Sequence, residues 1–395
     1  MEETIKKKKM NKGLKISLIT LATVIGLIIV FAASFVIYVL ASYSRLGDMD
    51  LTINKNSTLE AIDVNTTYSA STYNIGFGAY SQDYTFFLDT GYDNDGNPTC
   101  GHWSKAFSKD RVLENTTGAI NAIKELNPDF MLFQEVDTNS TRSYKVDQNQ
   151  MIIESFVTYD NYHCVNFHSA FLPYPLYDMH GIVNAGLTTL SKYKANDAKR
   201  YQYTVADDLS KLFDLDRCFS VSYINVLTDK KLYIVNSHMS AYDEGGTIRE
   251  QQMKELNTFL KACKDSGDYV IVGGDFNHDL ITYNPMYSYT DTNRAYGMTK
   301  KAPDWVAYMF DEKGKSPIID GYTIWAADNN PTCRNNDIEW DPEETFVCTV
   351  DGYIVSNNIN VTQIKAIQTK QGVKGIDGFA FADHEPVYIE FELVG

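Results

Sequence analysis

The sequence is poor in proline and cysteine, and each scarcity excludes a class of protein. It has only 10 prolines in 395 residues and no low-complexity block, whereas 44% of its residues are hydrophobic. A chain of this composition can bury a large core and is neither disordered nor collagen-like. Its 6 cysteines are scattered without a C-x-x-C pair, so they are too sparse to form a disulfide framework for so large a domain.

Isolated disulfides are still allowed if the domain lies outside the cytoplasm. Cys333 and Cys348 flank one loop and are the pair expected to bond. Cys164, Cys218 and Cys263 are interpreted as small buried apolar residues.

Charge is missing from one long segment near the amino terminus. No charged residue occurs from Ile16 to Leu40, which is rich in Ile, Leu, Val and Phe. A helix of about 20 apolar residues crosses the hydrocarbon layer, so residues 16–40 are predicted to form a transmembrane helix. A cleaved signal peptide is the alternative, but its apolar region is normally about 7–15 residues long, and no small-x-small cleavage site follows this one.

Basic residues are concentrated before that helix and scarce after it. Residues 1–15 hold six lysines and two glutamates, and the rest of the chain has 29 basic and 49 acidic side chains, a net charge of −20. By the positive-inside rule, this tail is predicted to be cytoplasmic and the rest extracytoplasmic in a single-pass protein of a bacterial plasma membrane. So acidic a surface repels nucleic-acid phosphates.

Beyond the apolar segment, residues 41–68 are polar and predict a stalk, and residues 69–395 predict one folded domain. Interleaved strands and helices favour a layered α/β fold, with two sheets packed face to face as one arrangement and the strand order left open. The predicted helices are Asn115–Leu126 and Thr247–Lys264. The predicted strands are Ser71–Ile75, Phe130–Phe133, Gly186–Leu190, Phe219–Val226, Leu232–Asn236, Tyr269–Val272, Tyr353–Val355 and Val387–Leu393.

The most informative stretch is the strand Tyr269–Val272 and the residues that follow it. Two glycines come next, and then Asp275, Phe276 and Asn277 stand where the strand must end. Alternation aims Asp275 and Asn277 the same way. A carboxylate beside an amide suits a hard cation, a water molecule and a phosphoryl oxygen, although Asp and Asn also close ordinary β-turns.

Other predicted strands also end in polar residues. Each ending alone has an ordinary explanation as a turn cap, a salt bridge or a satisfied core histidine. Six apolar strands that all end this way favour a functional site built from loops at one rim of the sheets. The residues concerned are Asn74, Glu135, His238, Asp275, Asp351 and the pair Asp383 and His384.

Six motifs together resemble the endonuclease/exonuclease/phosphatase superfamily, the deoxyribonuclease I-like fold shared with neutral sphingomyelinases and inositol-polyphosphate phosphatases. The resemblance extends from about Ser69 to Leu393. It implies a four-layer α/β sandwich, in which two packed mixed β-sheets are flanked by helices. The motifs are Y-N-I-G (73–76), Q-E-V-D (134–137), N-S-H-M-S (236–240), G-G-D-F-N (273–277), T-V-D-G-Y-I (349–354) and A-D-H-E-P-V (382–387).

The resemblance also implies roles for single residues. Glu135 resembles the principal ligand of a Mg²⁺ ion (Mn²⁺ being the alternative), with Asn74 beside it and Asp383 near the metal. Asp275 resembles the residue that orients or deprotonates the attacking water, and Asn277 the one that holds a phosphoryl oxygen.

The two histidines of the motifs are assigned by the same resemblance. His238 matches the family histidine that binds the phosphate, and His384 the second one, which is polarised by Asp351. The residues 186–191 hold no carboxylate, so the partner of His238 is left unassigned. Arg217 and Arg334 are further candidates for contact with the substrate phosphate.

The aromatic run Phe171–Tyr177 belongs to none of these motifs. It is interpreted as local packing, with a substrate-entry loop as the alternative.

The implied function is a membrane-anchored, Mg²⁺-dependent phosphoesterase on the non-cytoplasmic side. A lipid head-group or small phosphodiester is favoured as substrate, because the domain is acidic and the anchor holds it near a bilayer. An extracytoplasmic endo- or exonuclease is the alternative. A catalytically inactive surface binding protein of the same fold is the hypothesis from another class, and the complete set of motifs argues against it. No protein partner is indicated.

Overall fold

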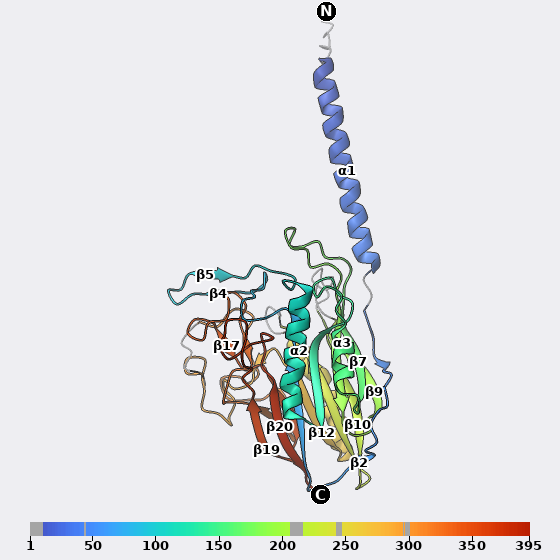
Figure 1. Cartoon of the computed structure of the whole chain (residues 1–395), viewed down its shortest axis with the longest axis vertical. Coiled ribbons are helices and arrows are strands. Elements are labelled where there is room, and N and C mark those ends of the chain that lie inside the picture. The colour runs from blue at the N-terminus through green and yellow to red at the C-terminus, as the bar shows by residue number, and fades with distance from the viewer. Residues whose placement is uncertain (1–10, 43–44, 206–215, 242–246, 295, 297–300) are drawn as a thin grey trace, which may run out of the picture. The chain divides into compact units, whose positions relative to one another are not determined.

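The computed structural model describes residues 11–42, 45–205, 216–241, 247–294, 296 and 301–395, which form two units (Figure 1). The first unit, residues 1–44, consists of helix α1 (Lys12–Ser42). Among the described helices, α1 alone is long and apolar enough to cross a membrane. The first ten residues of the predicted cytoplasmic tail lie outside the described part of the chain.

The second unit, residues 45–395, is built on two mixed sheets. The larger has eight strands in the order β1, β9, β10, β11, β12, β18 and β15, with β2 also pairing with β10. The smaller has six strands in the order β19, β20, β3, β6, β8 and β7.

The bounds of these strands, in chain order, are as follows. The larger sheet contains β1 (Met49–Asp50), β2 (Ala61–Ile62), β9 (Asn196–Gln202), β10 (Cys218–Val226), β11 (Lys231–His238), β12 (Tyr269–Asp275), β15 (Tyr322–Ala326) and β18 (Asp351–Ser356). The smaller contains β3 (Thr67–Asn74), β6 (Phe130–Asp137), β7 (Asp160–His168), β8 (Asn184–Ser191), β19 (Ile359–Ala366) and β20 (Val387–Leu393). Outside the sheets are the 3₁₀ turn η1 (Gly76–Gly78) and the ribbons β4 (Thr90–Tyr92) with β5 (Pro98–Cys100), β13 (His278–Asp279) with β14 (Ala307–Tyr308), and β16 (Cys333–Arg334) with β17 (Val347–Cys348).

Helices cover the outer faces of both sheets. Helices α2 (Lys109–Leu126) and α3 (Gln148–Ser155) pack on the smaller sheet (Figure 1). Helix α4 (Thr247–Ser266) packs on the larger one. The two sheets bury a core between them that includes Phe130, Ile271 and Phe391. The predicted four-layer α/β sandwich, with two packed mixed sheets and flanking helices, is therefore confirmed.

Helix α2 shows how local sequence produces one of these layers. The Ser108 hydroxyl accepts a hydrogen bond from the backbone N–H of Arg111 at the start of the helix, and Asn127 ends it in the left-handed conformation. Between these caps, the buried residues Ala119, Ile120 and Ile123 share one face, which packs on the sheet.

Each sheet has a parallel pair of strands near its centre, and β2 with β10 forms a further parallel pair in the larger sheet. The central pairs are β3 with β6, joined through α2, and β11 with β12, joined through α4. Parallel neighbours end at the same edge, so the carboxyl ends of four strands lie at one rim of the sandwich. Asn74, Glu135, His238 and Asp275 stand at or next to these four ends.

The predicted stalk, residues 41–68, is instead mostly part of the folded unit. From Arg45 onward the chain belongs to the second unit, where β1 pairs with β9 and β2 with β10. Ile62 is buried in the core between the sheets. The prediction of a stalk from polar composition was wrong because short edge strands are held mainly by backbone hydrogen bonds. Such strands leave no apolar pattern in the sequence.

The eight predicted strands and both predicted helices are present, at or within four residues of their expected bounds except that α2 begins at Lys109, six residues before the predicted Asn115. The sequence pattern missed β7, β9, β15, β19 and α3. All six cysteines are free thiols. The predicted disulfide between Cys333 and Cys348 is therefore absent, although the two residues face each other on β16 and β17. Cys164, Cys218 and Cys263 are buried, as predicted.

Candidate active site

A pocket of about 520 Å³ lies where the predicted site residues converge. Its polar lining contains eight of the ten residues singled out from the sequence, namely Glu135, Arg217, His238, Asp275, Asn277, Arg334, Asp383 and His384. The other two, Asn74 and Asp351, are buried behind them and are hydrogen-bonded to residues that line the pocket. The structure thus brings all ten together.

Glu135 points into this pocket because strand β6 is bulged. The register with β8 shifts between Phe133 and Val136, and Glu135 has a φ of 53°, in the left-handed region. A bulge redirects side chains, and such backbone strain concentrates at functional sites. The preceding Gln134 turns between the sheets, where its amide donates to Asn236 Oδ1 at 2.8 Å. The bulge therefore separates a structural amide from a carboxylate that faces the pocket.

Asn74 connects groups from both sheets. Its Nδ2 donates to Glu135 Oε1 at 3.3 Å and to Asp275 Oδ2 at 3.0 Å. Its Oδ1 accepts from the backbone N–H of Gly76 at 3.0 Å. The amide nitrogen, not the oxygen, faces the two carboxylates, so Asn74 holds them in place in this arrangement.

Asp383 and Glu135 form a pair of neighbouring carboxylates. Asn336 Nδ2 donates to Asp383 Oδ2 at 2.9 Å, while the buried Oδ1 finds no partner among the described residues. Burial, together with the negative charge of Glu135, raises the pKa of Asp383 to about 7, although the charge of His384 acts in the other direction. Two carboxylates that destabilise each other, one of them with an unsatisfied oxygen, fit the binding of a divalent cation.

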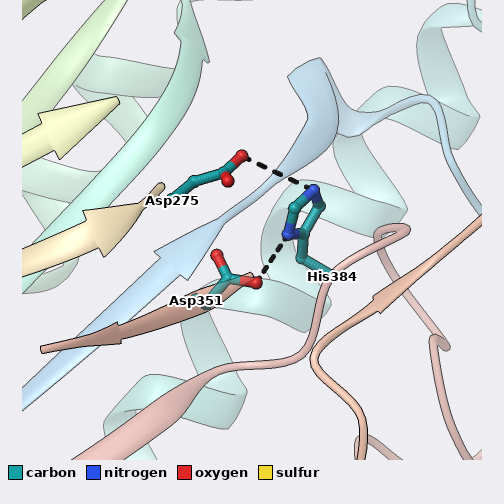
Figure 2. Close-up of side chains that lie close together, drawn as sticks. All are labelled: Asp275, Asp351 and His384. Atoms are coloured by element: carbon teal, nitrogen blue, oxygen red, sulfur yellow. Dashed lines mark hydrogen bonds and ion pairs between the residues drawn. The ribbon is translucent and has the colours of Figure 1, made fainter. Parts of the chain in front are cut away.

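His384 lies between two aspartates (Figure 2). Its Nδ1 is 2.8 Å from Asp351 Oδ2, and its Nε2 is 3.8 Å from Asp275 Oδ2. Burial lowers the pKa of His384, but the charges of Asp351 and Asp275 outweigh that effect and hold the pKa well above its ordinary value. The two carboxylates therefore favour the protonated imidazole, whose positive charge lies between them.

This cluster of Asp275, Asp351 and His384 is also compact enough to hold a cation, since one ligand atom from each residue lies within 4.8 Å of the others. A protonated His384 has no lone pair for a metal and already neutralises its neighbours. The pair Glu135 and Asp383, one of whose oxygens has no partner among the described residues, is the second group in the pocket that could hold a cation.

His238 has the opposite protonation state. Its Nδ1 lies 3.3 Å from Asn166 Nδ2, and its Nε2 lies 3.4 Å from Asp275 Oδ2. Because an ionised carboxylate can only accept, the neutral ring carries its proton on Nε2. Burial lowers the pKa of His238 well below its ordinary value, and the charge of Arg217 lowers it further. Asn166, on β7, is thus the partner that the sequence left unassigned. The sequence could have indicated Asn166 through the alternation of Tyr162, Cys164 and Asn166, which are all buried on one face of β7, a strand that was not predicted.

Asp275 is buried at the centre of these contacts. Burial raises its pKa to about 6, although the charge of His384 acts in the other direction. Its Oδ1 accepts from the backbone N–H of Asn277 at 2.8 Å. The side chain of Asn277 donates to Met239 O at 2.8 Å, and its φ of 50° turns the chain at the strand end.

Arg217 brings a positive charge with free donors to the pocket. Its Nε and Nη1 are buried and have no hydrogen-bond partner within the described ranges. The preceding residue, Asp216, pairs with Arg45 at 3.3 Å and Arg200 at 3.5 Å and not with Arg217. The nearby Asp214 lies outside the described residues. Unpaired guanidinium nitrogens beside a pocket suit an anionic ligand.

The other arginines of the pocket are held by the protein itself. Arg334 Nη2 donates to the carbonyl oxygens of Ser81 at 3.1 Å and Tyr84 at 3.3 Å. Arg142, which the sequence analysis missed, is bound by both oxygens of Asp137 at 2.9 and 3.1 Å. These contacts fix both side chains in the pocket wall. The buried Nε of Arg334 has no hydrogen-bond partner among the described residues, so Arg334, like Arg217, keeps a donor for an anionic ligand.

Most of the remaining wall of the pocket is apolar, with Asp89, Arg142, His180 and Asn336 as its further polar residues. The Phe171–Tyr177 run, interpreted from the sequence as local packing, contributes part of it. The apolar and aromatic residues that line the pocket are Tyr80, Phe86, Phe87, Leu88, Phe167, Leu172, Pro173, Tyr174, Ala241 and Trp305.

Comparison with known proteins agrees with this geometry. Residues 71–299, more than half of the chain, match the sequence profile of the Endonuclease/Exonuclease/phosphatase family. The chain belongs to the endonuclease/exonuclease/phosphatase family. Members of this family are phosphoester hydrolases and typically depend on a divalent metal. A sequence search of curated proteins finds no significant match.

Solved structures share the family fold. The endonuclease/exonuclease/phosphatase from Beutenbergia cavernae is 12% identical, with a TM-score of 0.50 over 84% of this chain and 72% of its own. TDP2 from D. rerio, complexed with a single-stranded DNA product, is 12% identical, with a TM-score of 0.50 over 83% of this chain and 100% of its own. Identities this low demonstrate the common fold alone.

Proposed function

We propose that the second unit is a divalent-metal-dependent phosphoesterase that hydrolyses a lipid head-group or a small phosphodiester. Mg²⁺ is the favoured metal, and Mn²⁺ is the alternative. The observation that carries the proposal is the convergence on one pocket of Glu135, Asp275 and His384, which belong to distant parts of the chain. Full retention of these groups argues against an inactive binding protein of the same fold.

Glu135 and Asp383 are the residues that would hold the metal, with Asn74 keeping Glu135 in place. A metal bound there supplies positive charge against the non-bridging oxygens of the phosphate. The unsatisfied Oδ1 of Asp383 supports this assignment, because a buried carboxylate oxygen without a partner is costly.

The other residues bind the phosphate, activate the attacking water or stabilise the leaving group. Arg217 and Asn277 hold the phosphoryl oxygens, and the Nε2–H of His238 donates to one of them. Asp275, with a pKa of about 6, is ionised at neutral pH; it orients the attacking water and takes its proton. Protonated His384 stabilises the departing oxygen, with Asp351 maintaining its charge.

Helix α1 is proposed as the uncleaved anchor of a single-pass protein, with the amino terminus in the cytoplasm and the enzyme outside a bacterial plasma membrane. Its length and its lack of charge from Ile16 to Leu40 support this, as does the lysine-rich tail. The DNA product bound by D. rerio TDP2 makes a nuclease the second candidate. The net charge of −20 beyond residue 15 weighs against a polyanionic substrate.

Removal of metal is expected to abolish turnover. The full-length protein in detergent is offered sphingomyelin, a chromogenic bis-phosphodiester, RNA and plasmid DNA, each with MgCl₂ and with EDTA. We expect hydrolysis of the lipid or the small diester in MgCl₂ and none in EDTA. Nicking of DNA at low protein concentration, sensitive to EDTA, would instead establish the nuclease. Activity that persists in EDTA would contradict the metal dependence.

Substitution of Asp351 tests the protonated state of His384. Asp351→Asn removes the carboxylate that contributes most to the raised pKa of His384, so this pKa should fall. The alkaline limb of the kcat profile is then expected to move to lower pH by about one unit or more. Asp377→Asn, at an exposed position, is the matched control. An unchanged alkaline limb in Asp351→Asn would show that His384 does not act in its protonated form.

A further inference from the structure

Large apolar side chains are exposed to solvent beside the pocket. Leu176 is 76% exposed, Tyr174 66% and Tyr177 63%, all in the connection between β7 and β8. Leu88 at 52% and Trp103 at 38% come from the connection between η1 and α2. We call these five residues the apolar rim. Single exposed apolar residues are ordinary, but a group beside a pocket marks an interaction surface.

The apolar rim is held in place by specific contacts. The ring of Tyr177 stacks on His102 with centroids 4.9 Å apart, and its hydroxyl donates to His102 O at 2.7 Å. The adjacent Asp178 accepts from the backbone N–H of Ser104 at 2.9 Å and pairs with Lys105 Nζ at 3.0 Å. These contacts join the two connections while Leu176 stays exposed, so the exposure is built into the fold.

The apolar rim is also continuous with the pocket. Leu88 and Tyr174 belong to both, and Tyr174 packs on Phe87, another residue of the pocket wall, with ring centroids 5.6 Å apart. Whatever covers the apolar rim is therefore placed at the mouth of the pocket.

The chain enters the domain at this same end. Arg45, its first residue, pairs with Asp216, and Leu46 N donates to Asp216 Oδ2 at 2.7 Å. The next residue after Asp216 is Arg217, which lines the pocket. Arg45 follows the unit that contains α1 directly in the sequence, so the pocket end is the end at which the chain joins that unit.

We propose that the apolar rim inserts into the bilayer that α1 crosses and presents the pocket to lipid head-groups. The proposal rests on the proposed function, because it takes α1 as an anchor and the pocket as a phosphoesterase site. Tyrosine and tryptophan favour the membrane–water interface, and Leu176 favours the acyl chains. The net charge of −20 beyond residue 15 disfavours attraction to anionic lipid, so apolar insertion is the contact that this surface offers.

Fluorescence quenching tests the contact without requiring turnover. The full-length protein carries Cys100→Ser, because Cys100 is exposed while the other five cysteines are buried. Leu176→Cys is labelled with a fluorophore in phosphatidylcholine vesicles that contain lipids with a nitroxide on the acyl chain. Leu227→Cys is the matched control. Leu227 is 67% exposed and follows the far end of β10, about 30 Å from Arg217 along the strand.

We expect quenching several-fold stronger at position 176 than at position 227. Equal quenching at the two positions would overturn the proposal. A second copy of the chain is the other possible occupant of the apolar rim. Energy transfer between labels at position 176 that persists when the vesicles are diluted with lipid would show this contact and would overturn the proposal.

Activity gives a second, separable measurement. Leu176→Glu should lower turnover of a phospholipid in vesicles by at least about tenfold, while turnover of a soluble chromogenic diester changes less than about twofold. Leu227→Glu should affect neither. Equal loss on both substrates in Leu176→Glu would overturn the proposal. If the protein hydrolyses no phosphoester, the proposed function fails, and the quenching result still decides whether the apolar rim contacts the bilayer.

Discussion

The Asp275→Asn variant is expected to lose about 10²–10³ in kcat on any phosphoester that the full-length protein hydrolyses. Asparagine keeps the size of the side chain and its contact with Asn74, but it cannot accept the proton of the attacking water. The change also removes the charge that faces the Nε2 atoms of His238 and His384. The measurement is the kcat and KM of the purified variant, and the loss should fall on kcat.

The same variant is expected to fold at least as stably as the unmodified protein. Burial raises the pKa of Asp275 to about 6, so its ionised form is disfavoured in the folded state. The folded state then binds more protons than the unfolded chain between about pH 4 and 6, and the charge costs stability above that range. At pH 7.5 the Tm of Asp275→Asn should therefore equal or exceed that of the unmodified protein. The exposed Asp265→Asn on α4 is the control for removal of one charge. Near-normal kcat in Asp275→Asn would refute the assigned role.

The Glu135→Gln variant is expected to lose both turnover and the response to metal. Glutamine fits the bulge of β6 but removes one of the two carboxylates at the proposed metal site. We expect kcat to fall by about 10²–10³ at moderate metal concentration. The isosteric Glu154→Gln, on the exposed face of α3, is the matched control and should leave kcat unchanged.

Metal binding at Glu135 has a signature in stability that is independent of activity. Burial and the charge of Glu135 raise the folded-state pKa of Asp383 to about 7, so the domain without metal loses stability as the pH rises from about 4 to about 7. A divalent cation can take the place of that proton. MgCl₂ should therefore raise the Tm more at pH 8 than at pH 6. Glu135→Gln should abolish this difference, and Glu154→Gln should retain it. An equal Mg²⁺ effect in both variants would place the metal elsewhere.

These experiments also separate the enzyme from an inactive binding protein. A binding protein would show no metal-dependent turnover for Asp275→Asn or Glu135→Gln to reduce, whereas the enzyme should lose kcat in both variants. The opposite protonation states of His238 and His384 instead match the needs of hydrolysis, one ring as a neutral donor and the other as a cation.

Most of the fold was predictable because its elements are periodic in the sequence. The strands with apolar runs and the helices with an apolar face were found within a few residues of their bounds. The strand β7 was missed because polar residues interrupt it, and the stalk was misassigned because edge strands depend on backbone pairing. Those elements exist through their neighbours and leave little trace in local composition.

The sequence by itself determined the class of fold and the set of side chains at the candidate site, because motifs with Asn, Asp, Glu and His stand at the ends of recognisable strands. Only the tertiary structure decided how those groups behave. Asn74 contacts Asp275, 201 positions away, and lies 3.4 Å from His384, 310 positions away. The bulge that turns Glu135 into the pocket, the partner Asn166 and the protonation of each histidine all follow from such long-range contacts. Because pKa values and metal affinity depend on burial and on charges a few ångströms away, they belong to the folded arrangement and not to any motif.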